Sequence, residues 1–216
     1  MNMHQISTRH RIIETFAGAF ALIENASGEL ATIWTSIGDA AWVLPRGSRH
    51  HPRLLPALAR RLQRYFAGEA VDFDDVPTPQ GSPFFERCWQ ACRLIPRGET
   101  RSYAQLAALA GSGPKAARAA GQAMRRNPLA VIVPCHRVVG AAGQLHGYSG
   151  NRDPASPQIA VKRALLTLEG ALESSHDRRL LTVAPSVNGD GSNTQCSTGT
   201  CYRWHPGTLK TFGPAA

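Results

Sequence analysis

The chain has 216 residues, of which 43% are hydrophobic, and its formal net charge is +9 at pH 7. That length supports one or two small domains, each with a buried core. No apolar stretch approaches the ~20 residues that span a membrane as a helix, and residues 1–11 lack the apolar core of a secretory signal. Five cysteines, an odd number, do not indicate a disulfide scaffold, so the composition favours a cytoplasmic protein.

Residues 1–75 predict a small α/β domain, a β-sheet with a helix. Apolar segments at 20–23 and 30–34 flank turn-forming residues, a pattern typical of a β-hairpin. An amphipathic helix is expected where apolar residues recur at helical spacing, at Leu54, Leu55, Leu58, Leu62 and Phe66. The Pro- and Asp-containing stretch 71–83 predicts a linker, which we place at 76–83, and a second domain is expected over 84–173.

Residues 103–126 predict a helix-turn-helix. A helix is expected over 103–110, a turn at the Gly-Ser-Gly that follows, and a second helix from Pro114 to Arg126. Proline suits the first helical turn, and a proline at 128 disfavours helical geometry at the residue before it. The second helix has a face made of Lys115, Arg118, Gln122 and Arg125.

The remaining positions of this second helix are mostly Ala or Gly. A thin basic helix can approach DNA closely. The alternative is that these alanines are ordinary helix formers packed in a core. The sequence leaves both interpretations open for individual alanines.

Positive charge is concentrated in the middle of the chain. Residues 82–170 carry 12 basic and 4 acidic side chains, whereas residues 1–81 carry 8 of each. Between Thr100 and Arg152 there are seven basic residues and no Asp or Glu. A field of one sign suits a polyanion, and the alternative of a merely solvated basic face usually comes with interspersed acids. The charge pattern therefore favours nucleic acid as the partner.

The pentapeptide Pro134–Val138, which reads PCHRV, follows the apolar, strand-like run 131–133 and predicts a reactive thiol. Only the thiolate of Cys135 is a good nucleophile, and His136 or Arg137 could favour it. The alternatives are an inert buried Cys and, less well supported, a zinc ligand.

An amphipathic helix is expected over 157–168, with Glu169 at its end, where a carboxylate is unfavourable unless a cation compensates it. An exposed Glu before a terminating glycine is the alternative. Residues 174–216, rich in Gly, Ser, Thr and Asn, predict a largely disordered tail.

Residues 82–170 resemble the catalytic domain of the O6-alkylguanine-DNA alkyltransferases, and bacterial members in particular. The resemblance weakens toward Leu54 and is loose before it. Six motifs carry it, in order: IPRGETRSY at 95–103, KAARAAG at 115–121, RNP at 126–128, PCHRV at 134–138, GYSG at 147–150 and LEG at 168–170.

The resemblance implies a small α/β N-terminal domain followed by a mostly α catalytic domain with a winged-helix-like helix-turn-helix. It implies a monomeric protein that binds double-stranded DNA containing O6-alkylguanine, with no cofactor, no metal and no membrane. The implied activity is direct-reversal DNA repair, in which a methyl or other alkyl group passes irreversibly from O6 of guanine to Cys135 in a single turnover, with O4 of thymine as a second candidate donor.

The same resemblance implies roles for individual residues. His136 would act through a water as the base for the thiol, Glu169 would orient His136, and Asn127 would support the thiolate. Tyr103 would donate a proton to the departing guanine. Arg118 would enter the base stack after the damaged base has flipped out. Further DNA contacts would come from Lys115, Gln122, Arg125, Ala119, Ala120, Gly121 and Arg101, and the pocket walls from Val133, Pro134, Val138, Tyr148, Ser149 and Gly150.

Two features depart from the family pattern: an insertion at 151–158 next to the expected pocket, and the tail. Some relatives bind zinc in the N-terminal domain, but no cysteine precedes Cys88 here, so we expect no such site. Cys196, Cys201 and His205 give only a thin hint of a metal in the tail. The alternatives to the alkyltransferase are a non-catalytic alkylated-DNA sensor of the same fold, which would replace the cysteine, and a cysteine hydrolase.

Overall fold

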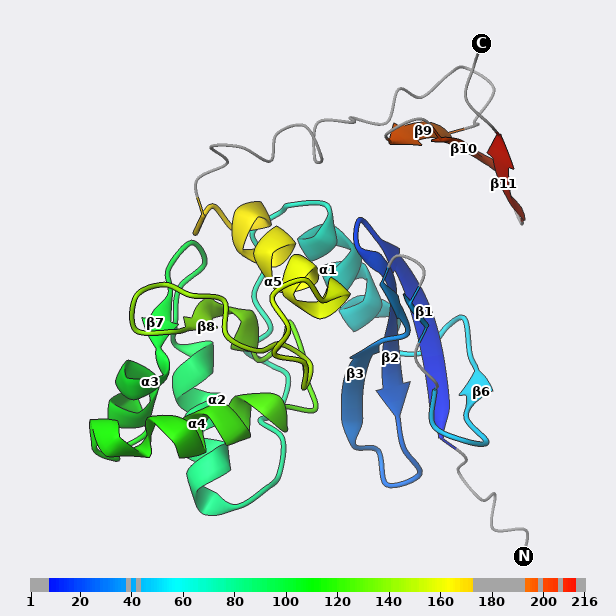
Figure 1. The fold of residues 1–216 in the computed structure, drawn as a ribbon. Coiled ribbons are helices and arrows are strands. Elements are labelled where there is room, and N and C mark those ends of the chain that lie inside the picture. The colour runs from blue at the N-terminus through cyan, green and yellow to red at the C-terminus, as the bar shows by residue number, and fades with distance from the viewer. Residues whose placement is uncertain are drawn as a thin grey trace, which may run out of the picture. The chain divides into compact units, whose positions relative to one another are not determined.

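The computed structural model describes residues 8–37, 40–41 and 44–172, together with the backbone of three strands between 193 and 212. The chain divides into two compact units, 1–172 and 173–216. The first unit contains an N-terminal sheet and a C-terminal group of helices (Figure 1). This arrangement confirms the predicted fold class.

A four-stranded sheet with the order β3-β2-β1-β6 forms the N-terminal half. Its strands are β1 (Arg9–Thr15), β2 (Gly18–Glu24), β3 (Leu30–Trp34) and β6 (Arg49–His50). The predicted hairpin is β2 with β3, paired antiparallel with Phe20 opposite Trp34. Strand β1, which the sequence analysis did not predict, pairs with β2 along its whole length. A separate pair, β4 (Ser36–Ile37) and β5 (Ala40–Ala41), follows.

Helix α1 (Pro56–Phe66) is the predicted amphipathic helix, and it begins two residues later than the first predicted apolar position. It packs on β1, and its buried face includes Leu58, Leu62 and Tyr65. Phe66 and Phe20 meet edge to face with ring centroids 5.1 Å apart. These aromatic contacts tie the helix to the sheet.

The C-terminal half holds the helix-turn-helix. Its elements are α2 (Pro83–Arg93), β7 (Arg101–Ser102), α3 (Tyr103–Leu109), the 3-10 turn η1 (Pro114–Ala116), α4 (Ala117–Arg125), η2 (Cys135–Arg137), β8 (Val138–Val139) and α5 (Pro157–Leu168). A capping box starts α3, with Ser102 and Gln105 bonded to each other's backbone. The second predicted helix is split, since its first turn is a 3-10 turn, and it ends at Arg125 with Arg126 as its C-cap, before Pro128.

The run 131–133 is not the strand that its apolar residues predict. Its chain turns back on itself, with Val133 N donating to Leu129 O at 2.7 Å and Val131 at φ 73°. The side chain of Asn127 holds the turn at both ends. The residues are apolar because this turn is buried on every side, which periodicity cannot distinguish from a buried strand.

One hydrophobic core runs through the whole first unit, from Ile13 to Leu165. Strand β3, at the edge of the sheet, also binds the segment that leads to Cys135, since Thr32 N donates to Pro128 O at 2.8 Å and Thr32 Oγ1 to Ala130 O at 2.9 Å. Cys88 and Cys92 are buried on α2, as core residues would be. Residues 1–172 form one compact unit, and the division at 76–83 into two domains stays a prediction.

The second unit contains a three-stranded antiparallel sheet of β9 (Asn193–Ser197), β10 (Thr200–His205) and β11 (Thr208–Phe212). Most of 174–216 lies outside the described residues, so the expectation of a largely disordered tail stays a prediction. The side chains of Cys196, Cys201 and His205, the candidate metal ligands, also lie outside the described residues. Within the described part of the chain, no helix has the length and apolar character needed to cross a membrane.

Candidate active site

A cavity of about 380 Å³ opens between the helix-turn-helix and the loop after β8. Cys135 lies in its wall, half-buried, at the first residue of η2. The other lining residues come from α3, α4 and the loop 146–152: Tyr103, Ala117, Arg118, Gly121, Gln122, Met124, Arg125, His146, Gly147, Tyr148, Ser149, Gly150, Asn151 and Arg152. The predicted reactive cysteine therefore faces a space that could hold a nucleobase.

Burial raises the pKa of the Cys135 thiol, while the side chain of Asn127 and the charge of Lys162 act in the opposite direction. The thiol is consequently protonated at neutral pH and needs a base to become a nucleophile. That base must come from an adjacent residue.

His136 follows Cys135 and is fully buried. Its Nε2 lies 3.1 Å from Glu169 Oε1 and 3.3 Å from the hydroxyl of Tyr65. A carboxylate only accepts hydrogen bonds, so Nε2 carries the ring hydrogen. Nδ1 is then the proton-accepting nitrogen, and it has no partner among the described residues. Burial lowers the pKa of His136, although Glu169 raises it, which keeps the imidazole neutral and able to accept a proton.

Glu169 is the residue just after α5, as predicted, and the cation that compensates it is Arg137. Arg137 holds both carboxylate oxygens, with Nε to Oε2 and Nη2 to Oε1, each at 2.8 Å. Tyr65 adds a hydrogen bond to Oε1 at 2.7 Å. His136 and Arg137 hold the pKa of the Glu169 carboxyl well below its usual value despite its burial. Glu169 therefore stays ionised beside the histidine.

Asn127 connects the end of α4 to the cysteine. Its Nδ2 donates to Val133 O at 2.9 Å and its Oδ1 accepts from Leu129 N at 3.0 Å, and the same side chain lowers the pKa of Cys135. The amide thus fixes the turn that presents the thiol and lowers the thiol pKa at the same time.

Three comparisons bear on this site. The family model described as the DNA binding domain of 6-O-methylguanine DNA methyltransferase matches residues 83–171. A methylated-DNA–protein-cysteine methyltransferase of Methanosarcina barkeri is 37% identical over 158 residues, covering 73% of this chain and 94% of that protein. One of Mycolicibacterium paratuberculosis is 45% identical over 117 residues, covering 54% of this chain and 70% of that protein.

The fold agrees with these sequences. The crystal structure of Mycobacterium tuberculosis OGT in complex with DNA is 35% identical with a TM-score of 0.63, over 80% of this chain and 99% of that one. The chain belongs to the methylated-DNA–protein-cysteine methyltransferase family. The resemblance first seen in six motifs is therefore confirmed.

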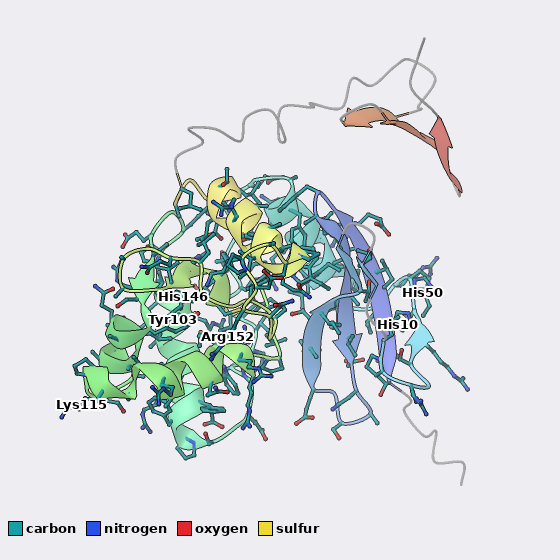
Figure 2. The ribbon with its side chains drawn as sticks, in the orientation of Figure 1. His10, His50, Tyr103, Lys115, His146 and Arg152 are labelled. Carbon is teal, nitrogen blue, oxygen red and sulfur yellow. The ribbon has the colours of Figure 1, made fainter. Side chains whose placement is uncertain are left out.

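The predicted DNA-binding residues of this methyltransferase fold differ in whether they line the cavity. Arg118, Gln122, Gly121 and Arg125 line the mouth of the cavity, and Ala119 is exposed beside them. Lys115 is exposed on η1 but does not line the cavity, and Figure 2 shows it pointing outward at the far end of the helices.

Two residues of the predicted DNA-binding set differ from expectation. Ala120 is fully buried, which confirms the core alternative for that alanine and means that its side chain is not available to DNA. Arg101 is bound locally, with Nη2 donating to Glu99 Oε2 at 2.7 Å. The DNA-binding roles of the exposed residues stay predictions.

The predicted pocket residues are also divided. Tyr148, Ser149 and Gly150 line the cavity that contains Cys135. Val133, Pro134 and Val138 do not, because they are buried behind the cysteine and support it through the backbone. Tyr103 lies in the cavity wall and donates from its hydroxyl to His146 O at 2.8 Å. Burial raises the pKa of Tyr103 to about 12.

Sequence reasoning missed two buried polar residues next to the site. Tyr65 lies on α1, and it is not among the apolar positions that predict this helix. Lys162 lies on α5 with its Nζ bonded to Val138 O at 2.6 Å, and burial lowers its pKa to about 8. A lysine in the apolar face of an amphipathic helix was the one available signal, because lysine is almost never fully buried without a partner.

Proposed function

We propose that this protein repairs DNA by moving an alkyl group from O6 of guanine to the sulfur of Cys135, once per molecule. The observation that carries the proposal is the place of Cys135 in the wall of a cavity bordered by the basic helix α4, followed at once by His136, whose Nε2 lies 3.1 Å from Glu169 Oε1. We expect double-stranded DNA to bind along α4 and the damaged base to enter the cavity, since O6 is out of reach inside the duplex.

The chemical step follows from the hydrogen bonds of the site. The thiol proton passes to His136 Nδ1, through a water, and the imidazolium is stabilised by Glu169. The thiolate attacks the alkyl carbon and a C–S bond forms as the C–O6 bond breaks. The electron pair leaves with guanine, which takes a proton from the Tyr103 hydroxyl, and Tyr103 recovers its proton from solvent. The thioether is stable, so the protein is consumed.

Two alternative functions are less well supported. A non-catalytic sensor would not need Cys135, and a hydrolase would need an oxyanion hole and a path for turnover. We also propose that the protein acts as a monomer in the cytoplasm, where a reactive thiol stays reduced.

The deciding experiment mixes the protein with an equimolar duplex that contains one O6-methylguanine and follows it by intact and peptide mass spectrometry. We expect one methyl group on the peptide containing Cys135 and no second addition. The Cys135→Ala variant should bind the same duplex without gaining mass. Tight binding by the wild type with no mass change would favour the sensor, and neither binding nor transfer would favour the hydrolase.

A further inference from the structure

The insertion 151–158 contributes residues to the cavity wall and is held in place by hydrogen bonds. Tyr148 and Asn151 exchange backbone hydrogen bonds of 2.9 Å in both directions, closing a turn over Ser149 (φ 45°) and Gly150 (φ 85°). Positive φ at both central residues is the geometry of a type I′ turn. The insertion therefore leaves the loop GYSG in a fixed direction, back toward the cavity.

Side chains then hold the insertion itself. Asn151 Oδ1 accepts from Asp153 N at 2.9 Å, and Asn151 Nδ2 donates to Gln158 Oε1 at 3.2 Å. Asp153 Oδ1 accepts from Ala155 N at 2.9 Å, and Ser156 caps α5. These are local side chain to backbone turns that fix a loop without a core of its own. Arg152 lies between the two anchored residues.

The position of Arg152 is defined by its contacts. Its stem packs over the backbone of Gly147, with Cγ 3.8 Å from the place that a Cβ would occupy there. The side chain lines the same cavity as Cys135, and its charge acts on the hydroxyl of Tyr103. Figure 2 shows Tyr103, His146 and Arg152 in the same region of the molecule.

Within the described part of the chain, the cavity presents only positive charge to a ligand. The described residues of its lining include three guanidinium groups, on Arg118, Arg125 and Arg152, and no carboxylate. Arg152 makes no ion pair within 4.0 Å in the part of the chain that the structure describes. The carboxylate of its neighbour Asp153 accepts the hydrogen bond from Ala155 N described above. A guanidinium so placed has its hydrogen-bond donors available for an anionic oxygen group.

We propose that the insertion makes Arg152 a specificity residue, which binds an anionic oxygen group of the flipped nucleotide at the edge of the cavity. This rests on the proposed alkyl transfer. Two sources carry that chemistry: a carboxylate at the end of the alkyl group on O6, and the phosphate next to the flipped base. Arg152 is not needed for transfer of a small neutral alkyl group from a free base.

The experiment compares the wild type with Arg152→Gln on three substrates: a duplex containing O6-methylguanine, the same duplex containing O6-carboxymethylguanine, and a free O6-alkylguanine base. The readout is the second-order rate constant for alkylation of Cys135. The control is Arg163→Gln, which removes an exposed arginine of α5 that does not line the cavity. Arg152→Lys keeps the positive charge but loses the planar guanidinium with its paired hydrogen-bond donors, so it should retain part of the effect.

If the ligand is the carboxylate, Arg152→Gln slows transfer from the carboxymethyl duplex about tenfold, the size of one charge-assisted hydrogen bond, and leaves the methyl duplex unchanged. If the ligand is the phosphate, both duplexes slow equally and the free base does not. Rates that match those of Arg163→Gln on every substrate, or equal losses that persist on the free base, overturn the proposal. Absence of transfer by the wild type would instead contradict the proposed function.

Discussion

The hydroxyl of Tyr65 donates a 2.7 Å hydrogen bond to Glu169, which lies 104 residues later in the chain. Tyr65 belongs to α1 of the N-terminal half, whereas Glu169 ends the last helix of the catalytic half. The N-terminal half therefore completes the environment of the proposed triad of Cys135, His136 and Glu169, in addition to supporting the segment before Cys135 through β3.

We expect Tyr65→Phe to lower the free energy of unfolding by about 1.5 to 3 kcal/mol, because it removes a buried hydrogen bond to an ionised group and keeps the ring. Urea denaturation measures this loss. Tyr148→Phe is the control, since among the described residues its hydroxyl bonds only to the neutral Trp34, at 3.3 Å, and should contribute about 1 kcal/mol. A smaller loss for Tyr65→Phe than for Tyr148→Phe would contradict the importance of the Glu169 bond.

Arg137→Met should destabilise the protein by about 3 to 5 kcal/mol, because it leaves the carboxylate of Glu169 buried without its principal counter-charge. The Glu169 side chain is 0% exposed and that of Arg137 13%. The control is Arg64→Met, whose pair with Glu69 is about half exposed and should contribute less than about 1 kcal/mol.

The double variant Arg137→Met/Glu169→Gln removes the charge together with its partner and should recover part of the stability. If Arg137→Met and Arg64→Met lowered the free energy of unfolding by the same small amount in chemical denaturation, the buried Arg137–Glu169 pair would not be a principal source of stability.

The difference in free energy of unfolding between the wild type and Glu169→Gln should become smaller as the pH is lowered. The pKa of Glu169 in the folded protein is below its ordinary value of 4.5, so below that pH the unfolded chain binds more protons than the folded one. The contribution of the carboxylate is therefore complete above about pH 4.5 and is lost as the pH falls through the folded pKa. Urea unfolding between pH 3 and pH 7 should show the difference narrowing only at the acid end. A difference in free energy of unfolding that grew as the pH fell would contradict this prediction.

Asn127→Ala should raise the pKa of Cys135 further, because the amide that favours the thiolate is gone, and should slow alkyl transfer. We expect a loss of about 1 to 3 kcal/mol in stability as well, from the unpaired groups left in the turn. The measurement is iodoacetamide labelling of the Cys135 peptide as a function of pH. Asn25→Ala removes a similar side chain from an exposed turn, where it accepts from Ser27 N and Glu29 N, and should leave the labelling profile unchanged.

Arg118→Ala should slow repair of O6-methylguanine in duplex DNA more than attack on a free alkylguanine base. Arg118 is exposed on α4 at the mouth of the cavity, where it can occupy the place of the flipped nucleotide. Single-turnover rates on the two substrates measure the effect. Equal losses on both would show that Arg118 acts in the pocket and not on the base stack.

The sequence by itself determined the features that depend on neighbouring residues. The period of α1, the turn after α3, the proline after α4 and the end of α5 at Glu169 could all be predicted, because helix formation is governed by residues a few positions apart. The pentapeptide with Cys135 and the acid-free basic window likewise needed no tertiary structure, since nucleophile chemistry and net charge are local properties.

Only the tertiary structure decided which distant groups meet. No spacing rule relates Tyr65 or Thr32 to the active-site segment, because the contacts arise when the sheet and the helices share one core. The turn at 131–133 was mistaken for a strand because complete burial removes the alternation that separates the two. Ala120, on the helix face expected to meet DNA, proved to be core. Arg152 entered the cavity wall because the type I′ turn directs the insertion there, and turn geometry depends on φ angles that composition alone does not specify.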